Sequence, residues 1–435
     1  MKRKKISVAF ILICGIIWGT LYTKYSQKET TITVGFYSGS NWGVPENESV
    51  KILDDAITKF ESSHPGVKVK YVSGILKKDY SEWLSGRFLT GNEPDVLLLT
   101  PEDFNLFASK DALLNLDTFI QQDSNFKQNA YYEGPLNFGR YEQVQYALPY
   151  ECMPTLMCVN KTLIEESGIK FPASDWNWAD FHDICRRVTK DVDGDGENDQ
   201  FGVYHYTWQD AAYSNGALLF NDKGTENYVD SNKVVNAVNY VYTLYALNDG
   251  YEVMENDFEL GKVAFCPMSF SEYKTYKSYP WCLEKYTNFD WDCITMPAGP
   301  DGSNISELNI LLMGISKCTK EKQLAWEFLK MMTYDEEIQN EIFQYSEGVS
   351  ALKNVTSSED VYHLLNQDNN SNSISVALLN QVMSQTIAPI RFNKYESALS
   401  MLNEGVENAM ESEKNIQVAL ISLQRKINNF LKNGY

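Results

Sequence analysis

The sequence lacks the motifs that mark common catalytic centres. It has only four histidines, and it contains no HExxH, GxSxG or phosphate-binding glycine loop. Each of these motifs supplies groups that its chemistry requires, so their absence argues against metalloprotease, serine-hydrolase and nucleotide-hydrolysing activities. With 58 acidic residues, some carboxylates will lie close together by chance, so a glycosidase pair cannot be recognised from sequence. We expect no enzymatic activity, and a secreted glycan-degrading enzyme is the alternative.

Positive charge is also scarce. The chain has 38 basic and 58 acidic residues, which gives a net charge of −20. Five of the basic residues lie in the first 24 positions, where there is no acid, so the remainder is more acidic still. Such a surface repels nucleic acid and anionic lipid, and we expect no nucleic-acid partner.

The eight cysteines do not follow a metal-binding or disulfide-framework spacing. No CxxC occurs, which argues against zinc. If Cys14 lies in a membrane segment, an odd number of cysteines remains. One bridge, for instance between Cys282 and Cys293, is one alternative, and buried free thiols are the other.

The amino terminus resembles an export signal. MKRKK precedes the apolar run ISVAFILICGIIWGTLY, whose 17 residues are at the short limit for a spanning helix. No A-x-A cleavage site appears. The sequence around Cys14 is similar to a lipoprotein box, except that Ile13 stands where a small residue is expected. Residues 1–29 therefore contain an uncleaved membrane anchor, a lipid-attachment signal or a cleaved signal, followed by a short polar tether. Each alternative places the rest of the chain outside the cytoplasm, and attachment to the outer face of the membrane is favoured.

Strand and helix patterns alternate along the chain. Strands are predicted at 30–39, 67–74 and 94–100, with helices at 49–66 and 79–91 between them. This βαβαβ order implies parallel strands with helices on both faces of a sheet. Further elements are predicted as strands at 144–151 and 155–161, helices at 232–247 and 320–333, and a mostly helical segment at 376–433.

Seven blocks of sequence together resemble a known family. These are FESSHPGVKVKYVSG, PDVLLLTPEDFNLFASKDALLNLDTFI, YALPYECMPTLMCVNKTLIEESGI, DWNWADFHDICRRVTKDVDGDGENDQFGVY, GKVAFCPMS, ITMPAGPDG and KQLAWEFLKMMTYDEEIQNE. Their order and spacing are similar to those of extracellular solute-binding proteins, the receptor subunits of ABC importers for sugars. The resemblance covers roughly residues 30–350.

The resemblance implies an α/β, two-lobed, periplasmic-binding-protein-like (Venus flytrap) fold with parallel-rich sheets, hinge strands and a central cleft. It places 30–148 and 290–345 in the N-terminal lobe, and 149–289 and 346–435 in the C-terminal lobe. The implied protein is a monomer that binds a carbohydrate, closes around it and works with ABC permease subunits. A surface sugar sensor without a transporter is a further alternative.

The resemblance also indicates where to look for the ligand. Sites in such folds lie beyond the carboxyl ends of parallel strands. A sugar packs its C–H face on aromatic rings, and its hydroxyls bond to carboxylates and amides. The candidate residues are therefore aromatic, acidic or amide residues expected after strands: Tyr37, Trp42, Asp95, Glu151, Trp208, Phe270, Glu272, Tyr273, Trp281, Asn309 and Glu347.

Two of these candidates, Asp95 and Glu151, have structural alternatives. Asp95 could instead cap a turn, and Glu151 could be a solvated hinge carboxylate. By contrast, four other tryptophans lie within predicted helices, caps or strands and are expected in the core: Trp176, Trp178, Trp291 and Trp326.

The segment KDVDGDGENDQFG (190–202) resembles the first part of a calcium loop. Gly196 stands at the sharp turn of such a loop, but Gly202 stands where the bidentate glutamate should be. The pattern indicates either a weak structural calcium site or an acidic surface hairpin, and no other cofactor is expected. The candidate ligands are Asp191, Asp193, Asp195, Glu197 and Asp199.

Overall fold

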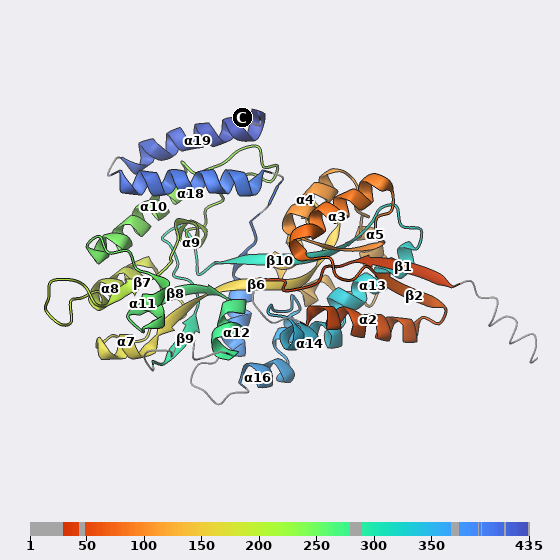
Figure 1. The fold of residues 1–435 in the computed structure, drawn as a ribbon, viewed down its shortest axis with the longest axis horizontal. Coiled ribbons are helices and arrows are strands. Elements are labelled where there is room, and N and C mark those ends of the chain that lie inside the picture. The colour runs from red at the N-terminus through yellow and green to blue at the C-terminus, as the bar shows by residue number, and fades with distance from the viewer. Residues whose placement is uncertain are drawn as a thin grey trace, which may run out of the picture.

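The computed structural model describes residues 29–42, 48–278, 289–366, 374–389, 391–392, 394–412 and 415–433. Two α/β lobes lie end to end, and two long strands run between them (Figure 1). These crossing strands are β6 (Ala147–Asn160) and β10 (Ser306–Ile315). The predicted two-lobed α/β architecture with hinge strands is confirmed.

The first lobe is built on a mixed sheet. Strand β1 (Thr30–Gly35) pairs in parallel with β2 (Val67–Tyr71) and with β3 (Val96–Leu99). Strand β3 is buried along its whole length, as its run of apolar residues requires when both faces are covered. Strand β10 runs antiparallel to β3 and to β6, so the sheet is less parallel than predicted. The main helices of this lobe are α2 (Ser49–Ser63), α3 (Lys77–Thr90), α4 (Pro101–Ser109), α13 (Lys322–Tyr334) and α14 (Glu336–Tyr345).

Strand β6 belongs to both lobes. Its first half pairs with β10, and its second half pairs with β8 (Val263–Ser269) and β9 (Trp291–Ile294). Beyond β8 lies β7 (Phe201–Val203), in parallel. The sequence predicted two strands here, and that prediction is wrong. The ladder to β10 continues as far as Pro154, and the ladder to β8 takes over at the next residue.

Helices cover the second lobe. Two of them begin with capping boxes, Asn177 with Asp180 and Thr207 with Asp210. The C-terminal helix pair packs on α10, as the blue and green ribbons of Figure 1 show. The main helices of this lobe are α8 (Trp178–Val188), α9 (Trp208–Ser214), α10 (Asn232–Tyr245), α18 (Tyr395–Glu411) and α19 (Ile416–Asn433).

Shorter elements connect these parts. The helices are α5 (Asp117–Gln122), α6 (Glu133–Phe138), α7 (Lys161–Glu166), α11 (Glu255–Glu259), α12 (Phe270–Ser278), α15 (Lys353–Thr356), α16 (Glu359–Leu365) and α17 (Val376–Ser384). The strands are β4 (Arg140–Tyr141), β5 (Val144–Gln145) and β11 (Thr386–Ile387).

The buried apolar side chains form two cores. Leu97 and Phe328 belong to the first core, and Phe181 and Leu420 belong to the second. The apolar side chains that are buried between residues 349 and 383 pack in the first core, whereas α18 and α19 pack in the second. The lobe boundaries stay a prediction, although this packing divides the segment 346–435 between the cores.

Within the described ranges, no helix combines the length and apolar content that crossing a bilayer requires. Residues 1–28, which form nearly all of the predicted signal or anchor, lie outside those ranges.

Candidate functional site

Glu151, on the crossing strand β6, is the centre of a buried polar cluster. Its Oε1 accepts hydrogen bonds from Trp42 Nε1 at 2.7 Å, Ser346 Oγ at 2.6 Å and Gly348 N at 2.8 Å. Its Oε2 accepts one from Asn41 Nδ2 at 2.6 Å. Burial raises the pKa of Glu151, and these four hydrogen bonds oppose that rise. Because its acceptors are occupied, the carboxylate fixes its neighbours instead of facing an open space.

The loop after α14 approaches Glu151 closely. A Cβ at Gly348 would lie 2.3 Å from Glu151 Oε1, so only glycine fits there without a shift. The adjacent Glu347 is buried as well. After burial itself, the charges of Glu151, Asp103 and Glu347 contribute, in that order, to raising the pKa of Tyr37. The structure thus brings together four of the predicted residues, namely Tyr37, Trp42, Glu151 and Glu347.

Two lysines lie near this cluster. Lys77 is the first residue of α3; its Nζ donates to the carbonyl oxygen of Asn41 and lies 5.5 Å from the ring centroid of Trp42. Burial lowers the pKa of Lys77, and the carboxylates of Glu151 and Glu102 oppose this effect. Lys77 is thus influenced by Glu151 and also by Glu102, which bonds to Arg391.

The second lysine, Lys274 on α12, caps the end of α14. Its Nζ donates to the carbonyl oxygens of Phe343 at 3.1 Å and Ser346 at 2.5 Å. A cation at the carboxyl end of a helix is favoured by the helix dipole. Burial lowers the pKa of Lys274, with Glu151 and Glu347 acting in the opposite direction. This contact joins a helix that packs on β8 to a helix of the first lobe.

A second polar group lies on β10. Glu307 and Asn309 alternate with buried residues along the strand and are half-buried. Arg391 donates to Asn309 Oδ1 at 2.5 Å, to Glu102 Oε1 at 2.9 Å and to Glu396 Oε1 at 3.4 Å. Glu102 belongs to α4 of the first lobe and Glu396 to α18 of the second. Arg391 therefore links both lobes over the crossing strand.

Glu307 has an unusual protonation equilibrium. Burial, together with the nearby charge of Asp210, raises the pKa of Glu307 to about 7, and Arg391 acts in the opposite direction. Near neutral pH this group can therefore be either a hydrogen-bond acceptor or a donor. Perturbed carboxyls of this kind are typical of functional sites, although ion-pair networks produce them too.

Asp95 lies elsewhere, and the prediction that it follows a strand is wrong. It precedes β3, at the end of the sheet opposite the carboxyl ends of the parallel strands. Its carboxylate accepts hydrogen bonds from Thr33 N and Oγ1, both at 2.8 Å, and from Thr319 Oγ1 at 2.5 Å. These bonds hold β1 to the segment before α13.

Trp208 is part of the second core. It is 4% exposed, and its Nε1 donates to Asn403 Oδ1 at 3.1 Å, so its indole packs between α9 and α18.

Glu272 caps the first turn of α12, because its Oε2 accepts from Ser269 N at 2.6 Å and from Ser269 Oγ at 2.7 Å. Both side chains thus have structural partners in this conformation.

Phe270 and Tyr273 do not line an open surface. Phe270 and Tyr273 are buried in the first core, and the hydroxyl of Tyr273 accepts a hydrogen bond from Ile374 N at 3.0 Å. Trp281 lies outside the described residues.

Sequence reasoning missed several charged residues near the crossing strands. Glu102 could have been found, because it is the second residue of α4, the helix that follows β3. Arg391 had no signal, since it lies between β11 and α18 in a segment that was predicted to be mostly helical. Lys77, Lys274 and Glu307 are recognised only by their neighbours in space.

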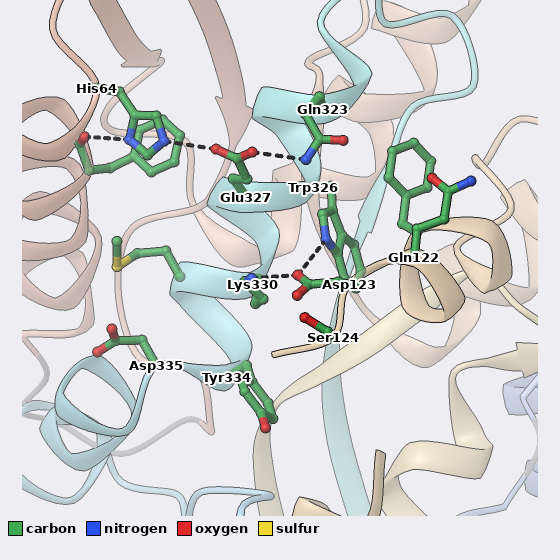
Figure 2. A pocket seen from close by; sticks show the side chains of 13 residues that line it. His64, Gln122, Asp123, Ser124, Gln323, Trp326, Glu327, Lys330, Tyr334 and Asp335 are labelled. Atoms are coloured by element: carbon green, nitrogen blue, oxygen red, sulfur yellow. Dashed lines mark hydrogen bonds and ion pairs between the residues drawn. The ribbon is translucent and has the colours of Figure 1, made fainter. Parts of the chain in front are cut away.

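A cavity of about 630 Å³ lies away from this site, between α2, α5 and α13 on the first lobe (Figure 2). Polar side chains in its lining pair with one another, Lys330 with Asp123 at 2.5 Å and His64 with Glu327 at 2.8 Å, whereas Asp335 pairs with Lys59. Two further cavities, of about 540 and 490 Å³, lie on the second lobe beside α10. None of these three cavities includes Glu151 or Arg391.

The acidic loop brings three of its five predicted ligands together. The carboxylate oxygens of Asp191, Asp193 and Asp195 lie within 4.8 Å of one another. Hydrogen bonds from Gly196 N at 2.8 Å and Gly194 N at 2.6 Å lower the pKa of Asp191.

The other two predicted ligands are outside this group. Asp199 Oδ2 instead accepts from Val192 N at 2.9 Å and Asp193 N at 3.2 Å, and the side chain of Glu197 is exposed. Three converging carboxylates suit a hard cation, but calcium binding stays a prediction.

Comparisons with known proteins agree with this architecture. Residues 45–338 match the family model of the bacterial extracellular solute-binding proteins. The putative ABC transporter periplasmic-binding protein YcjN of Escherichia coli K12 is 22% identical over 257 residues, which are 57% of this chain and 55% of that protein. The chain thus matches little more than half the length of this relative.

Solved structures share the fold at low identity. An ABC substrate-binding protein from Listeria monocytogenes, in complex with cycloalternan, has a TM-score of 0.65 and 21% identity, with 93% of this chain and 99% of that chain covered. The sugar-binding protein MalE from Xanthomonas citri has a TM-score of 0.75 and 15% identity, with coverages of 92% and 97%. Because the family model matches more than half of the sequence, this chain belongs to the bacterial extracellular solute-binding proteins.

Proposed function

We propose that this chain binds an oligosaccharide between its two lobes and passes it to an ABC permease without chemical change. The observation that carries the proposal is Arg391, whose hydrogen bonds join α4 of one lobe to α18 of the other over the half-buried Glu307 and Asn309. Relatives with the same fold are described with cycloalternan and with mannotriose. The shared family makes a related ligand class the first one to test.

The side chains near the crossing strands suit a sugar. Trp42 is half-buried, and its indole is fixed by the bond to Glu151, so it can offer a rigid ring for the C–H face of a pyranose. Glu102, Asn309 and Arg391 supply acceptors and donors for hydroxyl groups, and the charged ones make the stronger hydrogen bonds.

Closure is the second part of the proposal. Strands β6 and β10 connect the lobes, and the bonds of Arg391 reach both. A ligand that touches both lobes favours the arrangement in which they are closest, and the permease then recognises that arrangement. A ligand with equal affinity for open and closed arrangements would not produce this shift.

The remaining expectations belong to the same proposal. Residues 1–29 hold the protein at the outer face of the membrane, as an anchor or through a lipid. The protein acts as a monomer, and the acidic loop 191–199 takes a structural calcium ion. Intact-mass analysis of the membrane-extracted protein distinguishes an uncleaved anchor from a lipid, and size-exclusion chromatography with light scattering measures the oligomeric state.

A thermal-shift screen of mono- and oligosaccharides tests the ligand class. A ligand that binds only the native state stabilises it by mass action and so raises its melting temperature. At a free ligand concentration of one hundred times the dissociation constant, the free energy of unfolding increases by about 2.7 kcal/mol. We expect at least one oligosaccharide to raise the melting temperature, and titration calorimetry should confirm that it binds. Release of reducing ends from polysaccharide would contradict the proposal and support the glycan-degrading alternative.

The matched variants are Arg391→Ala and Arg186→Ala. Arg186 is an arginine on the surface of α8 that pairs with Asp183, so its loss should leave binding unchanged. Loss of Arg391 should weaken binding at least tenfold, because a charged hydrogen-bonding group is removed from the site. Equal affinities of the two variants for the positive sugar would overturn the assignment of the site.

A further inference from the structure

Three cysteines form a row across three adjacent strands. Cys158 of β6 is directly opposite Cys266 of β8 on one side and Cys293 of β9 on the other. The three side chains are at most 7% exposed. All three belong to the first core, whereas Met157 and Val159, their neighbours on β6, belong to the second. The thiols therefore lie on the same face of the sheet, as opposed residues of antiparallel strands do.

The thiol of Cys266 has a partner outside the row, because it donates to the carbonyl oxygen of Pro267 at 3.4 Å. Cys158 and Cys293 are directly opposed in the ladder between β6 and β9. Burial, and then the neighbouring Cys293 thiol, raise the pKa of Cys158. Opposed residues of antiparallel strands have Cα atoms about 4.5–5.5 Å apart, and a disulfide accommodates about 4.4–6.8 Å. The Cys158–Cys293 pair can thus be bridged without moving the strands.

We propose that Cys158 and Cys293 form a disulfide once the chain is outside the cytoplasm, where its family acts. Disulfides form and persist in such oxidising compartments. The bond links the crossing strand β6 covalently to β9, so it stabilises the part of the second lobe that contains the end of β6. Among the described side chains, the group of three or more possible metal ligands that lie close together consists of the three aspartates of the acidic loop and includes no cysteine. A disulfide therefore suits the thiol row better than a metal ion does.

The oxidant in this step is itself a disulfide, either of a small molecule or of an oxidised dithiol enzyme. The thiolate of Cys158 attacks it, which forms a mixed disulfide and releases one thiol. The thiolate of Cys293 then attacks the sulfur of Cys158, which forms the protein disulfide and releases the second thiol. The two protein thiols lose two protons and two electrons, and the oxidant's two sulfur atoms take them up.

Burial determines when the reaction occurs. Burial raises the pKa of Cys158, so its thiolate is scarce in the folded protein, and the packed sheet keeps oxidants away. The bond therefore forms while the strands are pairing during folding. Afterwards the same burial shields it from reductants. Reduced, folded protein should oxidise slowly, and mild denaturant should accelerate the reaction.

Peptide mapping tests the proposal on the full chain. The protein is exported by the expression host, denatured without reductant, alkylated with N-ethylmaleimide and digested. We expect a linked peptide pair that contains Cys158 and Cys293, with Cys266 alkylated. Alkylation of both Cys158 and Cys293 would overturn the proposal, and so would a link from Cys158 to Cys266 or from Cys293 to Cys282.

A stability measurement provides a second test. Wild-type protein that has been unfolded and refolded with dithiothreitol should melt about 5 °C lower than the oxidised protein, whereas Cys293→Ser should have the lower melting temperature after either treatment. The control is Cys185→Ser, a buried cysteine of the second core, which should keep the response to reductant. Equal responses of wild type and Cys293→Ser to dithiothreitol would contradict the disulfide.

Discussion

The indole Nε1 of Trp42 donates a 2.7 Å hydrogen bond to Oε1 of Glu151, across 109 positions of sequence. The bond attaches the loop after β1 to a crossing strand that both lobes share. Since the same carboxylate also accepts from Ser346 and from the amide of Gly348, three separate segments meet at one buried charge. Glu151 thus positions the aromatic residue, and Trp42 is the one of the two that is exposed enough to meet a ligand.

Removal of the Glu151 carboxylate should destabilise the fold strongly. Glu151→Ala leaves four donors without their acceptor, three of them on buried residues, and we expect a loss of about 3–5 kcal/mol in the free energy of unfolding. Urea denaturation measures this loss. Glu165→Ala, at an exposed position of α7, is the control and should stay within about 0.5 kcal/mol of wild type. A Glu151→Ala variant as stable as this control would show that the cluster is not buried as described.

Two glycines should respond in opposite ways to alanine. A Cβ at Gly348 meets Glu151 Oε1 at 2.3 Å and the carbonyl oxygen of Cys152 at 2.8 Å, so Gly348→Ala should cost about 1–3 kcal/mol. Gly86 lies within α3, and a Cβ added there would meet no atom within 4 Å, so Gly86→Ala should stabilise by about 0.5–1 kcal/mol. Both free energies come from chemical denaturation, and a gain in stability at Gly348 would contradict the close approach.

Glu307 should make stability depend on pH near neutrality. The pKa of Glu307 is about 7 in the folded protein and about 4.3 in an unfolded chain, so between these values the folded state binds more protons. The contribution of Glu307 to the free energy of unfolding therefore falls as the pH rises from about 4.5 to 7. Glu307→Gln removes the titration, and we expect the variant to be more stable than wild type by about 1–2 kcal/mol at pH 8, after allowance for partial exposure.

Melting curves at pH 5, 6, 7 and 8 check this prediction. The advantage of Glu307→Gln should shrink as the pH falls towards 5. Other groups titrate in the same range; burial, for example, also raises the pKa of Glu341 to about 7, so the difference between variant and wild type is the quantity to follow. A difference that does not change with pH would show that the carboxyl of Glu307 is not perturbed.

Calcium should stabilise the protein through the acidic loop. With a dissociation constant of about 1 mM, as in weak extracellular sites, 10 mM Ca²⁺ adds about 1.4 kcal/mol of stability. We expect a rise of about 1–3 °C in melting temperature over the value in chelator, and Asp193→Asn should abolish it. Magnesium is the control ion. An unchanged melting temperature in calcium would favour the acidic hairpin alternative.

Local patterns predicted most of the scaffold. Leu53 and Phe60 recur at helical spacing, and both are fully buried on α2. The four tryptophans expected in the core, Trp176, Trp178, Trp291 and Trp326, are buried. These assignments succeed because periodicity reports the face that an element buries, which depends on residues close in sequence.

The positions of individual site residues were harder to predict. Trp208 follows a strand, as a ligand residue would, but α18 packs against it from almost 200 positions away. Asp95 was expected after a strand but precedes β3, where its carboxylate bonds to Thr33 and Thr319, residues 62 and 224 positions away.

The amino-acid sequence by itself determined most of the helices and strands, the acidic net charge and the family, because each depends on composition or on patterns within short segments. Only the tertiary structure decided that Glu151 holds Trp42, that Arg391 reaches both lobes and that Cys158 lies opposite Cys293. Those relationships join residues more than one hundred positions apart, and no local periodicity specifies which side chains meet when two lobes and their crossing strands pack together.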